Sequence, residues 1–207
     1  TYAICPQIHT STNIICQKKY LLWQNGVFMK KLGFGTMRLP LINPEDKTSI
    51  DQNYFNQLAD KFIEKGFNYF DTAYTYHDEK SEGAIKKALT ERYDRKDYIL
   101  ADKMPTILVK SGDEYPMYFN RQLERTGAEY FDYYLMHNMG KDRYAKATEF
   151  GGFEFAEEMK KEGKIRKFGF SFHDDAETLD RILTEHPDVD FVQLQINYFD
   201  WNNKIIQ

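Results

Sequence analysis

The stretch FNYFDTAYTY, residues 67–76, gives the strongest indication of the fold in this sequence. Its apolar first half predicts a strand, so Asp71 and Tyr76 lie where that strand gives way to a loop. Two later apolar segments end in the same manner, one on Lys103 and the next on His137. In a parallel barrel the carboxyl ends of the strands converge on one mouth, where such folds carry their chemistry. We therefore expect these four side chains to meet there as a proton-transfer site.

The composition is that of a soluble globular protein. Of the 207 residues 42% are hydrophobic, and 15 Tyr and 16 Phe supply a large core. The formal net charge of −4 argues against nucleic acid or an acidic membrane surface as the main partner, and no stretch approaches the length of a membrane span. The only two cysteines, Cys5 and Cys16, are too few for a disulfide scaffold and lack a zinc pattern. We expect no metal site and a reducing, cytoplasmic location.

The first 28 residues differ from the rest. They mix Pro6, polar residues and short apolar pieces without a sustained period, and they lack the order of charged start and apolar core that a secretory signal requires. The segment that begins at Met29 leads directly into a strand. We therefore expect residues 1–28 to be an extension outside the native domain and residues 29–207 to form that domain. Because the first residue is Thr1 rather than Met, we also expect the sequence to be a fragment.

Strand-like and helix-like segments alternate after Met29. We expect strands over residues 32–38, 68–71, 98–103, 131–137, 165–171 and 191–196. We expect helices over residues 49–65, 81–89, 115–125 and 176–185, and a further helix that ends near residue 163. Strict alternation of this kind predicts right-handed βαβ units and a parallel sheet.

The glycine pattern after the first strand distinguishes two parallel folds. A doubly wound sheet with a dinucleotide site requires Gly-x-Gly-x-x-Gly there, but Gly33-Phe34-Gly35 is followed by Arg38 at the third position. We therefore predict the α/β class and a (β/α)8 TIM barrel, with about six of its eight βα units present. Closing such a barrel requires two more strands, so we expect strands one and six to be open edges.

The four ionisable residues have a clear chemical use. Reduction of a carbonyl group requires a hydride donor and a proton donor, and an unperturbed tyrosine is a poor acid at neutral pH because its pKa is about 10. An ammonium such as that of Lys103 stabilises the tyrosinate, and Asp71 would hold the lysine by an ion pair. His137 would orient the substrate oxygen, and Tyr76 would act as the general acid. Each residue alone could equally be a packing residue, a turn residue or part of a solvated rim. Their placement at three successive strand ends that point to the same mouth favours a catalytic role.

From about Met29 to its end, the chain resembles the aldo-keto reductase superfamily. The motifs that carry the resemblance are LGFGTMR (residues 32–38), the Asp71-Thr-Ala-x-x-Tyr76 signature, Lys103, LMH (135–137), GKIRKFGFS (163–171) and QINY (195–198). The resemblance implies NAD(P)H-dependent reduction of an aldehyde or ketone. It also implies that Asp71, Tyr76, Lys103 and His137 are the catalytic tetrad, with Tyr76 as the proton donor.

The resemblance further implies a cofactor site for NADP(H) or NAD(H). Ser171 and Gln195 would hold the nicotinamide carboxamide, and Thr36 and Met37 would lie beside the same ring. Asp71 would belong to the cofactor site as well. Many members have Ser-Asn at the end of strand five, whereas this chain has Ser171-Phe172-His173, so His173 is a candidate substitute. The residues that select NADP or NAD belong to strands seven and eight, beyond Gln207. The chain is most similar to bacterial members in which a ferredoxin-like iron–sulfur segment follows the barrel.

Three functional hypotheses follow. The first is an active reductase of a small carbonyl substrate. The second is a non-catalytic nucleotide-binding regulatory module on the same fold, and the third is an inactive truncated fragment. Turnover of a carbonyl substrate distinguishes the first from the other two, because a binding module binds the cofactor without reaction.

Overall fold

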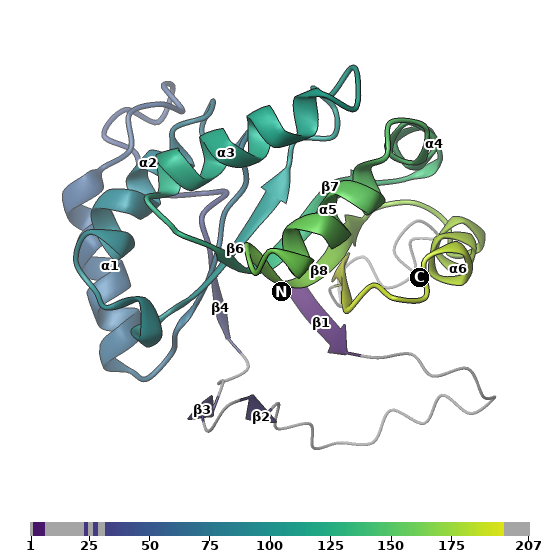
Figure 1. Cartoon of the computed structure of the whole chain (residues 1–207). Coiled ribbons are helices and arrows are strands. Elements are labelled where there is room, and N and C mark those ends of the chain that lie inside the picture. The colour runs from purple at the N-terminus through teal and green to yellow at the C-terminus, as the bar shows by residue number, and fades with distance from the viewer. Residues whose placement is uncertain (1, 7–22, 25–26, 29–31, 197–207) are drawn as a thin grey trace.

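Six parallel strands curl into a half-barrel in the part of the chain that the computed structural model describes, residues 2–6, 23–24, 27–28 and 32–196 (Figure 1). The strands, in chain order, are β4 (Gly33–Gly35), β5 (Tyr69–Asp71), β6 (Ile99–Met104), β7 (Phe131–Met139), β8 (Ile165–Phe172) and β9 (Phe191–Gln195). The helices are α1 (Gln52–Glu64), α2 (Ser81–Ile85), α3 (Glu114–Thr126), α4 (Lys141–Glu149), α5 (Gly152–Lys161) and α6 (Ala176–Glu185). The predicted alternation and the partial (β/α)8 barrel are confirmed.

Two details of the helices differ from the prediction. The helix expected to end near residue 163 is preceded by another helix, α4, and the two are separated at Gly151, whose φ of 71° lies in the left-handed region that favours glycine. The second helix is α-helical only over α2 and continues as a π-helical turn, Lys86–Thr90. Neither difference changes the order of strands.

The far edge of the sheet is covered, which our prediction missed. The order of strands is β1-β9-β8-β7-β6-β5-β4, in which β1 (Tyr2–Pro6) pairs antiparallel with β9. The prediction that strand six is an open edge is therefore wrong. An edge strand presents unpaired N–H and C=O groups, and the five extended residues of β1 satisfy those of β9. A second small sheet joins β2 (Trp23–Gln24) to β3 (Val27–Phe28).

The curled sheet separates two apolar clusters. The larger one lies between the outer face of the sheet and the helices, and Phe70, Leu100 and Tyr134 belong to it. The smaller one fills the inner face and consists of Tyr69, Ala101, Tyr133, Leu135 and Phe191. Because both faces are buried, the strands are apolar almost throughout rather than alternating. Polar residues on the inner face are therefore exceptions that require an explanation.

Close packing and capping fix the elements around this sheet. A Cβ atom at Gly169 would lie 2.1 Å from the carbonyl oxygen of Phe191, so β8 approaches β9 only because this residue is glycine. The side chain of Asp51 caps α1 by accepting a hydrogen bond from the N–H of Tyr54, at 2.9 Å. Among the described residues, each helix is too short or too polar to serve as a membrane span.

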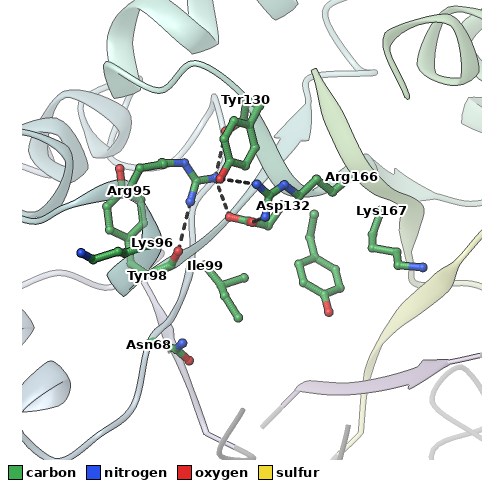
Figure 2. A pocket seen from close by; sticks show the side chains of 10 residues that line it. Asn68, Arg95, Lys96, Tyr98, Ile99, Tyr130, Asp132, Arg166 and Lys167 are labelled. Atoms are coloured by element: carbon green, nitrogen blue, oxygen red, sulfur yellow. Dashed lines mark hydrogen bonds and ion pairs between the residues drawn. The ribbon is translucent and has the colours of Figure 1, made fainter. Parts of the chain in front are cut away.

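A cavity of about 610 Å³ opens at the amino-terminal ends of the strands, and Asp132 is the centre of its lining (Figure 2). One Asp132 oxygen accepts from Arg95 at 2.6 Å and from the N–H of Leu100 at 2.9 Å, and the other lies 3.3 Å from Arg166. Both guanidinium groups stack on the ring of Tyr130. Because Asp132 pairs with both arginines and ties β6 to β7, we interpret this end of the sheet as a stabilising network.

Replacing Asp132 should test that interpretation. Asp132→Ala in the complete gene product should lower the free energy of unfolding by roughly 3 kcal/mol, because it leaves a partly buried Arg95 without its ion-pair partner and the N–H of Leu100 without an acceptor. Lys96→Ala is the matched control, since Lys96 pairs with Asp94 at the surface, and it should change the free energy by less than about 0.5 kcal/mol. Urea unfolding measures both. Equal effects of the two substitutions would show that Asp132 is not a structural centre.

Candidate active site

A buried ion pair lies at the carboxyl ends of β5 and β6. The Lys103 Nζ atom is 2.5 Å from Asp71 Oδ1, and the two side chains are only 2% and 5% exposed. Lys103 also donates to the carbonyl oxygen of Thr72, at 2.8 Å. The second carboxylate oxygen of Asp71 accepts from Gln193 Nε2 at 3.1 Å. Ion pairs at such depth are stable only when their remaining hydrogen-bonding groups are satisfied, as they are here.

A chain of hydroxyl groups holds the end of β5 below this pair. Thr36 donates to the backbone carbonyl of Asp71 at 3.0 Å and accepts from Ser81, which also contacts the hydroxyl of Thr72. Thr36 is fully buried, so its hydroxyl supports Asp71 rather than opening on the mouth. Met37, the next residue, has 48% of its surface exposed.

Tyr76 lies on the loop after β5 and faces Lys103 and His137, two of the other three members of the predicted tetrad. The centre of its ring is 5.0 Å from Lys103 Nζ and 5.8 Å from the centre of the His137 ring, at an interplanar angle of 80°. The structure therefore brings together all four residues that the sequence predicts for the proton-transfer site.

An unusual turn holds Tyr76 in place. The three residues after it, His77, Asp78 and Glu79, have φ values of 52°, 48° and 68°, which non-glycine residues adopt only when their surroundings enforce it. The imidazole of His77 accepts from the N–H of Leu39 at 2.9 Å, and its other nitrogen lies 2.8 Å from the carbonyl oxygen of Lys47. Because a carbonyl only accepts, Nδ1 carries the proton. His77 thus links the Tyr76 loop to the loop before α1, a role that the sequence analysis missed.

His137 lies at an irregularity of β7. The register between β7 and β8 shifts between Met136 and Met139, and Asn138 has a φ of 57°. The N–H of Asn138 donates to Ser171 Oγ at 2.6 Å, and Thr106 donates to the carbonyl oxygen of His137 at 2.6 Å. These bonds fix the backbone on both sides of the imidazole.

The site keeps one cation and one neutral imidazole. Burial disfavours the ammonium of Lys103, but the charge of Asp71 and the hydrogen bonds to Asp71 and Tyr76 outweigh it and raise the pKa of Lys103 above its ordinary value. Burial lowers the pKa of His137 to about 3, and the nearby positive charge of Lys103 adds to the effect. At neutral pH, Lys103 is charged and His137 is a neutral hydrogen-bonding group.

The predicted cofactor residues differ in how deeply they are buried. Ser171 is buried on the inner face, and its partner in the β8–β9 register is Gln193. Gln193 is 3% exposed and contacts Asp71, whereas Gln195, the residue named by the sequence analysis, is exposed. His173 is exposed as well. Gln193 is therefore a site residue that the sequence analysis missed. The feature of the sequence that could have identified Gln193 is its position two residues before Gln195, on the same face of the strand.

Known proteins resemble this chain in sequence and in fold. The model of the aldo/keto reductase family matches residues 31–207. The solved structure of the aldo-keto reductase AKR11C1 from Bacillus halodurans, in its holo form, superposes with a TM-score of 0.62 and 26% identity, covering 79% of this chain and 52% of that one. No sequence among the curated proteins matches.

Two further structures are similar in fold. An aldo-keto reductase from Klebsiella pneumoniae in complex with NADPH has a TM-score of 0.56 and 23% identity, over 76% of this chain and 50% of that one. The Bombyx mori aldo-keto reductase AKR2E4 in complex with NADP has a TM-score of 0.55 and 19% identity, over 77% and 52%. This chain thus spans about half the length of these relatives. By its fold and by the family match over residues 31–207, the chain belongs to the aldo/keto reductase family.

Proposed function

We propose that the protein containing this chain reduces an aldehyde or ketone to an alcohol with NADP(H) or NAD(H), and that Tyr76 donates the proton. The observation that carries the proposal is the buried Asp71–Lys103 pair, with the phenol of Tyr76 and the imidazole of His137 facing it at one mouth. Membership of the aldo/keto reductase family supports it independently. The substrate in this proposal is a small carbonyl compound, as the family membership supports.

Lys103 prepares Tyr76 for proton transfer. Its ammonium is fixed by Asp71 and lies against the phenol, so it stabilises the tyrosinate that remains when the proton has left. In the oxidation direction the same tyrosinate takes the proton back. His137, being neutral, donates a hydrogen bond to the substrate oxygen and orients it toward Tyr76.

The residues beside the pair fit a nicotinamide carboxamide. Asp71 only accepts, so the amide nitrogen of Gln193 must face it, and the Gln193 carbonyl oxygen is left as an acceptor. The Ser171 oxygen accepts from Asn138 and keeps its O–H as a donor. One donor and one acceptor on neighbouring strands complement an amide, which offers both. A bound nicotinamide cofactor supplies the hydride.

The remaining sequence predictions about the cofactor stay proposals. We assign the carboxamide contacts to Ser171 and Gln193, and retain Gln195 and the exposed Met37 as residues that border the ring. The start of the family match at residue 31 supports our proposal that the reductase domain begins at about Met29. In that proposal residues 1–28 precede the domain, and β1 within them pairs with the edge strand β9 of the domain's sheet. The ferredoxin-like iron–sulfur segment stays a prediction about sequence beyond Gln207.

Removal of the Tyr76 hydroxyl is the direct test. In the complete gene product, Tyr76→Phe should lower kcat for NAD(P)H-dependent carbonyl reduction by roughly 10²–10⁴, because a positioned general acid is lost. Cofactor binding, measured by titration, should be retained. Oxidation of NAD(P)H against a panel of aldehydes and ketones gives the rates.

A tyrosine outside the site provides the matched control. Tyr54 lies half exposed on α1, and Tyr54→Phe should leave kcat unchanged. If the wild-type protein binds the cofactor but reduces no carbonyl, the regulatory nucleotide-binding module replaces our proposal. If Tyr76→Phe reduces carbonyls as fast as the wild type, Tyr76 is not the proton donor.

The low pKa of His137 predicts an acid-dependent stability. The unfolded chain takes up a proton on His137 near its ordinary pKa of 6.5, whereas the folded chain does so only near a pKa of about 3. Between these values the unfolded state binds more protons, so His137 lowers the free energy of unfolding as the pH falls. His137→Gln should therefore be less acid-sensitive than the wild type from about pH 7 to about pH 5 in urea unfolding. Parallel pH curves would contradict the neutral imidazole.

A further inference from the structure

Two carboxyl groups are buried together on the outer face of β6, behind Lys103. Asp102 precedes Lys103 and therefore faces the helices instead of the mouth, and Glu82 reaches it from α2. Both residues have no exposed surface. Lone carboxylates at this depth are costly, so the pair requires a structural or functional reason.

The main chain of Lys103 supplies one reason. The carbonyl of Ala101 faces β5, where it accepts from the N–H of Thr72, and the N–H and carbonyl of Lys103 face the same side because they are two residues further on. The β5–β6 pairing ends at Asp71 and Ala101, so β5 offers the main-chain N–H and carbonyl of Lys103 no partner.

Asp102 and Gln122, on the outer face of the sheet, provide the hydrogen-bond partners that β5 does not offer to the main chain of Lys103. Asp102 Oδ1 accepts from the N–H of Lys103 at 2.8 Å, and Gln122 donates to the carbonyl oxygen of Lys103 at 3.0 Å. Gln122 is in turn held by the hydroxyl of Tyr134, at 2.5 Å. Asp102 thus fixes the backbone N–H of Lys103, and Gln122 fixes its carbonyl oxygen.

The remaining carboxyl oxygens indicate a shared proton. Glu82 Oε2 pairs with Arg125 at 3.2 Å, but Glu82 Oε1 and Asp102 Oδ2 are buried without a hydrogen-bond partner among the described residues. The two carboxyl groups are within hydrogen-bonding reach of each other. Two carboxylates cannot satisfy one another, because both only accept. One proton between them satisfies both orphaned oxygens.

The surroundings decide which carboxyl holds the proton. Burial raises the pKa of Glu82, but Gln122 and Arg125, which also pairs with Glu79, oppose this and favour the charged form of Glu82. The cation that acts on Asp102 is Lys103, which is already paired with Asp71. Burial, followed by the charge of Glu82, raises the pKa of Asp102 well above its ordinary range. The other titratable group that faces the pair is the phenol of Tyr134, which is buried and neutral.

We infer that Asp102 is a neutral carboxylic acid that donates a hydrogen bond to Glu82 while its other oxygen holds the N–H of Lys103. Asp102 is then a positioning residue for the lysine beside Tyr76, an assignment that rests on the proposed reductase function. An ionised Asp102 would repel Glu82 and leave both orphaned oxygens without a donor. The single proton therefore links the helix layer to the geometry of the tetrad.

Infrared spectroscopy of the complete protein tests the protonation state without requiring activity. At pH 7 the wild type should show the carbonyl band of a protonated carboxylic acid, and Asp102→Asn should lack it. The absence of this band from the wild type would overturn the inference. So would a band that persists in Asp102→Asn and disappears in Glu82→Gln, because Glu82 would then carry the proton.

Kinetics test the positioning role. Asp102→Val removes the acceptor for the Lys103 N–H and should lower kcat for carbonyl reduction roughly ten- to a hundredfold with little change in KM. Asp102→Asn should restore kcat to within about threefold of the wild type, because its amide both accepts from Lys103 and donates to Glu82. Wild-type kcat in Asp102→Val, or no rescue by Asp102→Asn, would overturn the role.

These experiments distinguish a failure of the inference about Asp102 from a failure of the proposed reductase function. If Asp102→Val does not fold, the kcat of Asp102→Asn and the infrared band still decide the inference. If neither wild type nor variants reduce any carbonyl, the reductase proposal fails, while the infrared comparison still shows whether Asp102 is protonated.

Discussion

The buried ion pair between Asp71 and Lys103 is the interaction on which the rest of the site depends. Either charge alone would be unstable at this depth, but each neutralises the other, and Gln193 and the Thr72 carbonyl satisfy what remains. The pair fixes one cation at the mouth of the half-barrel. That cation disfavours a second positive charge on His137, and in our proposal it also stabilises a tyrosinate at Tyr76.

Strand β6 carries a different electrostatic arrangement on each face. The inner face presents Lys103, fully ionised and paired, whereas the outer face presents Asp102, which we infer to be neutral and bonded to Glu82. The two systems meet at one peptide, because Asp102 holds the N–H of Lys103. A strand that extends beyond its neighbour needs such side-chain partners, and in our proposal they also position the lysine beside Tyr76.

The sequence predicted the parts of this fold that depend on local pattern. Alternating periodicities located the strands, and the rule that strand ends converge brought Asp71, Tyr76, Lys103 and His137 together. Features that depend on the stagger or contact of distant segments were not predictable. Gln193 and Gln195 share a face of β9, and only the register with Ser171 tells which is deep. The partners of His77 lie 30 and 38 residues away, and the pairing of β1 with β9 spans almost the whole described chain.

A double-mutant cycle on the ion pair would show whether each charge is stable only in the presence of the other. Asp71→Asn, Lys103→Met and the double variant of the complete protein would be compared by urea unfolding and by NAD(P)H-dependent carbonyl reduction. We predict that each single variant loses roughly 3–5 kcal/mol of unfolding free energy and that the double variant loses much less than their sum. All three should lose carbonyl reduction. Additive unfolding costs, or a double variant that still reduces carbonyls at the wild-type rate, would contradict the account.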